Sequence, residues 1–106
     1  MSRRIMRMIV FFDLPMITSG DLVDYGRFRK FLLNNGFIMM QKSVYSKLVL
    51  NNNSSKLLRN QIEKNLPQKG TIQIMQITEK QFGDIDYLIG ESQSKIVDSI
   101  DRVVEI

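Results

Sequence analysis

Strand-like and helix-like patterns follow one another along this chain in an order that few small folds accommodate. Residues 5–12 form an apolar, β-branched and aromatic run, and a helical apolar stripe then continues up to Gly36. Two short strand-like segments come next, followed by a second helical pattern around residues 57–66 and an alternating segment at residues 71–78. The order β-α-β-β-α-β predicts an α+β, ferredoxin-like fold, in which two helices cover one face of an antiparallel sheet.

Turn and capping residues place the boundaries of these elements. After the first strand we expect strands at residues 37–42, 44–50 and 71–78, and an extra C-terminal strand at residues 85–89. Thr18 or Ser19 is expected to cap the first helix, and Gly36 to end it in the left-handed conformation. Because 106 residues can build one core but not two, we expect one domain over residues 1–90. Residues 91–106 would form a C-terminal tail, either an edge strand for a dimer mate or partner protein or a frayed end.

The first strand is apolar on both of its faces. Met6, Met8, Val10 and Phe12 point to one side, whereas Ile5, Ile9 and Phe11 point to the other. Helices cover only one face of a ferredoxin-like sheet, so the second face would leave a large apolar patch in a monomer. We therefore expect a homodimer, formed through the helix-free face or by strand exchange.

The chain contains neither histidine nor cysteine. This excludes disulfides, zinc sites built from thiolates or imidazoles, cysteine nucleophiles and Ser-His-Asp triads. A bound metal would need oxygen ligands, which favours Mg²⁺, Mn²⁺ or Ca²⁺. The first apolar run contains Arg7 and has no cleavage site, so we expect no membrane span, no signal peptide and a cytoplasmic location.

Asp13 is the main candidate for a catalytic or metal-binding residue. It follows two aromatic residues at the end of the first strand, where loops converge, and its parity places it on the face of Ile9 and Phe11. In a two-fold dimer, two Asp13 side chains facing each other would hold one hydrated Mg²⁺, which normally takes one or two carboxylates and several waters. The alternative is structural, with Asp13 accepting hydrogen bonds in the turn before Pro15.

Basic side chains are unevenly distributed. Residues 1–80 carry 13 basic and 5 acidic side chains, whereas residues 81–106 carry 2 basic and 6 acidic ones. The expected fold brings together a strand, a helix and a hairpin that carry, respectively, Arg3, Arg4 and Arg7; Arg27, Arg29 and Lys30; and Lys42 and Lys47. Two copies would present a positive surface to nucleic acid, while an ordinary solvated face is the alternative. Arg7 lies within an apolar strand and needs a partner, for which Asp13 on the same face is a candidate.

Four sequence blocks resemble one known protein family. They are the first strand running into Phe12-Asp13-Leu14-Pro15, the basic helix at residues 25–33, the stretch at residues 36–48, and residues 70–82 with Thr78-Glu-Lys-Gln-Phe82. In this order they resemble the small CRISPR-associated adaptation protein family, Cas2, especially its type II form, over residues 1–90. The aromatic residue that the family has before its strand-end acid corresponds to Phe12.

The resemblance implies a ferredoxin-like homodimer that joins the CRISPR integrase, captures duplex DNA and inserts it as spacers in antiviral defence. It also implies Mg²⁺-dependent endonuclease (endoribonuclease) activity on single-stranded RNA or duplex DNA, with Mn²⁺ as an alternative metal. The catalytic, metal-binding acid of the family corresponds to Asp13, shared between subunits. The basic surface of the family has no strict motif. Arg27, Arg29 and Lys30 are therefore matched to it only because they lie on the basic helix that follows the acid.

Two functions of different classes remain open. The first is a metal-dependent phosphodiesterase built around the Asp13 pair, with arginine and lysine side chains neutralising phosphates. The second is a non-catalytic scaffold that holds duplex DNA by its backbone and positions another enzyme, which one acid per chain favours. An RNA-recognition module would need a basic-Gly-aromatic signature that this sequence lacks, and a dimeric regulator that binds a metabolite is a further alternative.

Overall fold

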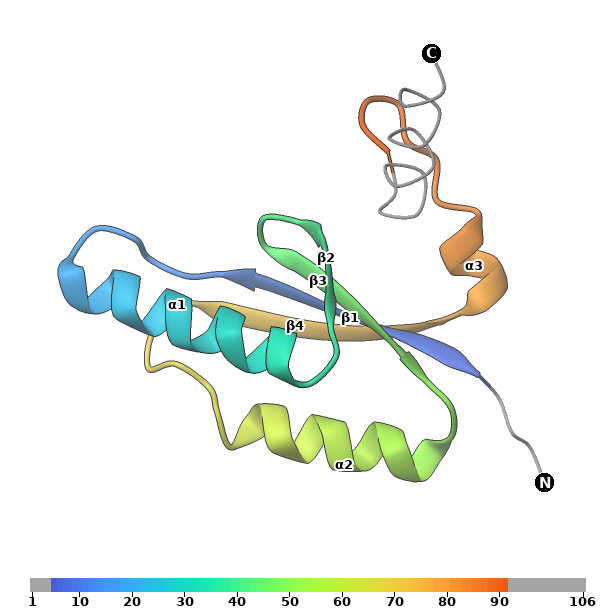
Figure 1. Ribbon diagram of the computed structural model, residues 1–106, viewed down its shortest axis with the longest axis horizontal. Helices are drawn as coiled ribbons and strands as arrows, with labels where there is room; N and C mark the ends of the chain where they lie inside the picture. Colours follow the sequence, from blue (N-terminus) through green and yellow to red (C-terminus); the bar gives the residue numbers. More distant parts are fainter. Residues whose placement is uncertain (1–4, 92–106) are drawn as a thin grey trace, which may run out of the picture.

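The computed structural model describes residues 5–91 as a four-stranded antiparallel sheet with two long helices on one face (Figure 1). The elements are, in chain order, β1 (Met6–Asp13), α1 (Ser19–Asn34), β2 (Ile38–Gln41), β3 (Val44–Val49), α2 (Asn52–Glu63), β4 (Thr71–Thr78) and a short α3 (Glu79–Gly83). The strand order is β2-β3-β1-β4. This is the arrangement of the ferredoxin-like fold, so the expected β-α-β-β-α-β core is confirmed.

The hydrophobic core lies between the sheet and the long helices. β1 occupies the middle of the sheet, and its residues Met8, Val10 and Phe12 are buried beneath the helices. The core is completed by side chains from both helices, from β3 and from the residue before β2, among them Phe28, Leu32, Phe37, Tyr45, Val49, Leu58 and Ile62. The side chains of β1 therefore alternate between the two faces as expected, and the even-numbered ones lie on the helix-covered face.

The two ends of α1 are fixed by its flanking residues and by one side chain from β3. Thr18 is the N-cap, and its hydroxyl and the Asp21 carboxylate exchange hydrogen bonds with each other's backbone N–H groups in a capping box. At the other end Gly36 has φ +87°, the left-handed conformation that glycine adopts most readily. The Lys47 ammonium donates a hydrogen bond of 2.5 Å to the Asn35 carbonyl, placing a positive charge at the negative end of the helix.

The strand expected at residues 85–89 is not formed within the chain. A second capping box, between Thr78 and Gln81, instead starts α3 directly after β4 and turns the chain away from the sheet. Residues 84–91 follow without regular structure, and the side chains of Leu88 and Ile89 are 88% and 96% exposed. A strand needs a partner edge, and the chain leaves β4 before it can pair there. The tail expected over residues 91–106 lies, apart from Glu91, outside the described residues.

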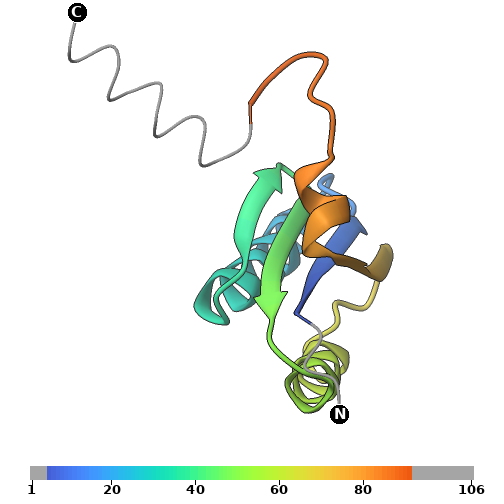
Figure 2. The same ribbon diagram turned by 90° about the vertical axis from the view of Figure 1, so that its right-hand side faces the viewer.

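The helix-free face of the sheet is covered in part by α3, which Figure 2 shows on the side of the sheet away from α1. Ile9 is buried on this face, opposite Ser46 of β3 and Met75 of β4. Ile38, Leu48 and Met75 are exposed on it. Residues 5–91 therefore leave an apolar area open on this side of the sheet. Among residues 5–91 no helix is long and apolar enough to cross a membrane.

Candidate functional site

Asp13 lies at the end of β1, beside a hollow of about 170 Å³. The hollow is also lined by Ser43 from the β2–β3 turn and by Thr71 and Gln73 from β4. Thr71 is the cross-strand partner of Asp13, and Gln73 is the partner of Phe11. The strand end thus gathers one carboxylate, two hydroxyl groups and one amide, all of which are oxygen-bearing groups.

The loop before β4 approaches this strand end so closely that it requires a glycine. Gly70 has φ +98°, and a Cβ atom added to it would lie 2.6 Å from both the Asp13 carbonyl oxygen and Leu14 Cδ2. Any other residue would clash there and would also be strained in its backbone. Gly70 therefore allows the α2–β4 loop to pack against the backbone of Asp13 and Leu14.

The carboxylate of Asp13 is exposed and makes no hydrogen bond or ion pair with the rest of residues 5–91. The turn hydrogen bonds that would give Asp13 a structural role are therefore not formed in this part of the chain. The same residues contain no group of three acidic side chains that could hold a metal ion. Mg²⁺ is commonly bound through one or two carboxylates and several waters, and Asp13 supplies one carboxylate of this kind.

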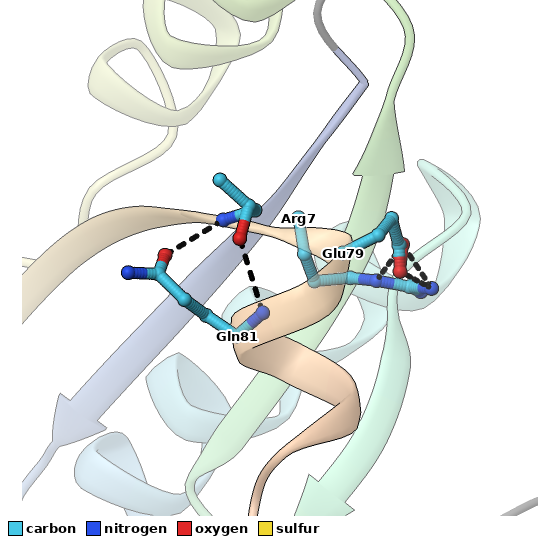
Figure 3. A network of polar contacts seen from close by, with 4 residues as sticks. Arg7, Glu79 and Gln81 are labelled. Atoms are coloured by element: carbon cyan, nitrogen blue, oxygen red, sulfur yellow. Dashed lines mark hydrogen bonds and ion pairs between the residues drawn. The ribbon is translucent and has the colours of Figure 1, made fainter.

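Arg7 pairs with Glu79 and not with Asp13, so that expectation was wrong (Figure 3). Arg7 Nη2 lies 2.7 Å and Nε 3.0 Å from Glu79 Oε2, and the guanidinium stands 4.3 Å from the centre of the Phe82 ring. Asp13 is six residues away along an extended strand, about 20 Å, which is too far for an ion pair. Because β1 and β4 pair in the register Met6–Thr78, the first residue of α3 comes to lie beside Arg7.

Of the basic residues expected to bind nucleic acid, those within residues 5–91 lie in different surroundings. Lys47 is engaged at the end of α1, and Arg3 and Arg4 lie outside the described residues. Four other basic side chains of this set are exposed: Arg27, Arg29, Lys30 and Lys42. Of these, Arg27 places its Nη1 atom 3.8 Å from Asp24 Oδ1.

On α1 the basic side chains are divided between two flanks. Arg27 lines a small hollow with Leu66 and Pro67, which follow α2. Arg29 comes two residues after Arg27, so its side chain lies about 200° around the helix axis from that of Arg27. It therefore shares a flank with Tyr25, whose hydroxyl donates to the Lys42 carbonyl in the β2–β3 turn.

The chain is similar to proteins of one family over most of its length. Residues 6–85 match the family described as CRISPR associated protein Cas2. A protein of Treponema denticola named CRISPR-associated endoribonuclease Cas2 is 48% identical over 93% of this chain and 98% of its own length. A protein of the same name from Streptococcus mutans serotype c is 48% identical over 93% of this chain and 91% of its own length.

A solved structure titled "Crystal structure of cas2" matches the fold. It covers 85% of this chain and 92% of its own, with a TM-score of 0.58 and 19% sequence identity. The ferredoxin-like sheet and these similarities agree with one another. The chain belongs to the CRISPR-associated Cas2 family.

Proposed function

We propose that this protein is a CRISPR adaptation protein with metal-dependent endonuclease activity, acting in antiviral defence as a homodimer that binds nucleic acid together with the CRISPR integrase. The observation that carries the nuclease part is the exposed carboxylate of Asp13, which has no partner within residues 5–91 and lies beside a polar hollow. It is supported by the name endoribonuclease that the relatives from Treponema denticola and Streptococcus mutans carry.

The exposed apolar side chains on the helix-free face of the sheet support the proposed homodimer. The exposed side chains of Ile38, Leu48 and Met75 would be covered if two copies stacked through this face around a two-fold axis. Asp13 lies at the end of the same face, so an axis near the strand end would bring the two carboxylates together. The dimer would then complete a metal site to which each chain contributes one acid.

The groups around Asp13 suit a hard cation with oxygen ligands. Two Asp13 carboxylates would hold Mg²⁺, or Mn²⁺ in its place, and the hydroxyl groups of Ser43 and Thr71 lie at the same hollow, where they would orient phosphate oxygens. When bound, such an ion neutralises charge on a phosphodiester and lowers the pKa of a coordinated water. Since the chain has no histidine, Asp13 is also the residue at this hollow that can accept a proton.

Asp13→Asn tests this proposal. The substitution keeps the size of the side chain and removes its charge, so we expect Mg²⁺-dependent cleavage of single-stranded RNA or duplex DNA to fall at least 100-fold while the dimer persists. Asp86→Asn, which removes an exposed acid from the segment after α3, is the matched control and should retain the activity. Cleavage assays with and without chelator, together with sedimentation equilibrium, measure both effects. Undiminished cleavage by Asp13→Asn would contradict the nuclease function.

A non-catalytic scaffold for duplex DNA is the second candidate. It is favoured by the position of Arg27, Arg29 and Lys30 on α1, because the long helices and Asp13 belong to opposite faces of the sheet. A duplex held against the helices would not reach the Asp13 hollow of the same chain. The scaffold therefore requires only that nucleic acid be positioned for another enzyme.

A spacer-integration assay separates the two functions. If the protein acts as a scaffold, Asp13→Asn copurifies with the integrase and supports integration at the wild-type rate. Replacing Arg27, Arg29 and Lys30 with alanine should instead weaken duplex binding and reduce its dependence on salt. Loss of integration in Asp13→Asn, with the complex intact, would refute the scaffold and favour catalysis.

A further inference from the structure

The outward side of α2, together with its C-cap Lys64, carries positive charge that has no partner within residues 5–91. Lys56, Arg59 and Lys64 are all exposed, and none of them forms an ion pair in this part of the chain. The inward side of the same helix is formed by Ser55, Leu58 and Ile62, which are buried. Packing in the core therefore does not require the basic residues.

Charge is divided between the two layers of the fold. The helical layer, defined as α1, α2 and residues 64–70, carries seven basic and three acidic side chains. Of these acids, Asp21 is engaged in the capping box of α1 and Asp24 lies beside Arg27. The third, Glu63, is exposed at the end of α2 and is a single acid beside three basic residues, Lys56, Arg59 and Lys64. The remaining described residues carry four basic and five acidic side chains. The positive potential of residues 5–91 is therefore concentrated on the helical layer.

The two long helices can act together on a long polyanion. They lie on the same side of the sheet (Figure 1), and the hollow beside Arg27 is also lined by residues 65–67, shortly after α2. The twelve residues of α2 extend about 18 Å, the length of about five base pairs of B-form DNA. The exposed amide side chains of Asn53 and Asn60 add hydrogen-bond donors along this length.

The aromatic side chains of the helical layer favour a duplex over a single strand. Phe28 is buried, Phe31 packs against the core, and Tyr25 is bonded through its hydroxyl to the β2–β3 turn. Among residues 5–91 the helical layer therefore presents no open aromatic platform on which unpaired bases would stack. Binding through basic side chains alone reads the phosphate backbone, which a duplex displays without unstacking.

We propose that α2 is a contact element for the phosphate backbone of duplex nucleic acid, through Lys56, Arg59 and Lys64. The inference rests on the nucleic-acid binding proposed above and names the surface that carries it. This surface lies on the opposite side of the sheet from Asp13, so the duplex that α2 contacts is held and not cleaved by the same chain.

Two charge-matched double variants test this inference. Lys56→Gln with Arg59→Gln removes two positive charges from α2. Lys80→Gln with Gln81→Glu makes the net charge more negative by the same amount on α3, and the carboxylate introduced at position 81 would keep an acceptor for the Thr78 N–H. Binding of a duplex of about 30 base pairs is measured by fluorescence anisotropy from 50 to 300 mM salt, and circular dichroism checks the fold.

The expected result is that the α2 double variant binds the duplex at least 10-fold more weakly at 100 mM salt. Its plot of log affinity against log salt should be shallower by about 1.8 for each bound chain, whereas the α3 double variant keeps the wild-type slope. Equal effects of the two double variants would overturn the role of α2 and leave the proposed function standing. If the wild-type protein shows no salt-dependent duplex binding, both the inference and the nucleic-acid binding of the proposed function fail.

Discussion

Tyr45 and Tyr25 show how differently two tyrosines are used within one core. Tyr45 is fully buried and stacks on Phe12 with ring centroids 5.5 Å apart, but its hydroxyl has no hydrogen-bond partner within residues 5–91. Tyr25 also contacts Phe12, and its hydroxyl donates to the Lys42 carbonyl at 3.0 Å. The Tyr45 hydroxyl is thus withdrawn from solvent without compensation, which disfavours the folded state.

We expect Tyr45→Phe to raise the free energy of unfolding by about 1 kcal/mol, because it removes a buried polar group that has no partner and leaves the ring in place. Tyr25→Phe is the matched comparison and should lower it by about 1 kcal/mol, since it deletes a hydrogen bond. Urea denaturation measures both changes. A loss of stability in Tyr45→Phe as large as that in Tyr25→Phe would show that the buried hydroxyl is hydrogen-bonded.

Among the structural elements, α1 depends on its first turn. The Asp21 carboxylate accepts hydrogen bonds from the backbone N–H groups of Thr18 and Ile17, at 3.1 and 3.2 Å. These bonds, the one from Thr18 foremost, hold the pKa of Asp21 below its ordinary value of 3.8, against the opposing effect of desolvation. A carboxyl group with a lowered pKa in the folded state stabilises the fold above its ordinary pKa, and the stabilisation is lost as the pH falls through the folded value.

The stability difference between the wild-type protein and Asp21→Asn should therefore depend on pH. We expect the variant to melt at a lower temperature than the wild type at pH 7. The gap should begin to close below about pH 4 and narrow further as the wild-type carboxylate is protonated. Thermal melts followed by circular dichroism between pH 2 and pH 7 measure this change. A difference that stays constant over that range would mean that the carboxylate charge does not stabilise the helix.

Local patterns were sufficient to predict most elements, and long-range placement was not. The cap at Thr18, the helix end at Gly36 and the alternation of β1 depend on neighbouring residues, so the sequence reveals them. The partner of Arg7 depends on the register between β1 and β4, and the sequence offered only the capping box of α3 as a clue. The prediction of a strand at residues 85–89 was wrong, because apolar composition does not reveal whether another strand is available to pair with it.

The candidate site was predictable in part for the same reason. Asp13 is marked by its position after an apolar strand, which is a local feature. Lys47 looked like another exposed base, but its register opposite Met8 places it on the helix-covered face, where it reaches the end of α1. The role that we propose for α2 was not predicted, because its basic residues are scattered along the helix and form no run in the sequence.

For the whole molecule, the two faces of the sheet differ in chemical character. The helical layer is basic, and the opposite face combines an open apolar area with the acid at the strand end. Such a division suits a dimer that closes its apolar faces together and turns its basic layers outward. Net charge alone, +4 for the chain, would not indicate this arrangement.

Met75→Glu tests the proposed dimer. The new carboxylate would be buried without a partner between two stacked helix-free faces, so we expect the dimer dissociation constant to rise at least 100-fold. Leu57→Glu introduces the same charge at an exposed position on α2, in the helical layer, and should leave the dimer intact. Sedimentation equilibrium measures both. A dimer in Met75→Glu as tight as in the wild type would show that the copies do not associate through this face.

The pairing of Arg7 with Glu79 joins residues 72 positions apart, from the first strand and the last described helix. The Arg7 side chain is only 19% exposed, and its guanidinium contacts Glu79 and Phe82, so a chain ending after Thr78 would lose an ion pair and a cation–π contact. Such a contact forms only after β1 and β4 have paired, since that pairing brings Glu79 to Arg7. The pair therefore stabilises the sheet only when α3 is present, so that during synthesis the domain gains this contribution only once α3 has been made.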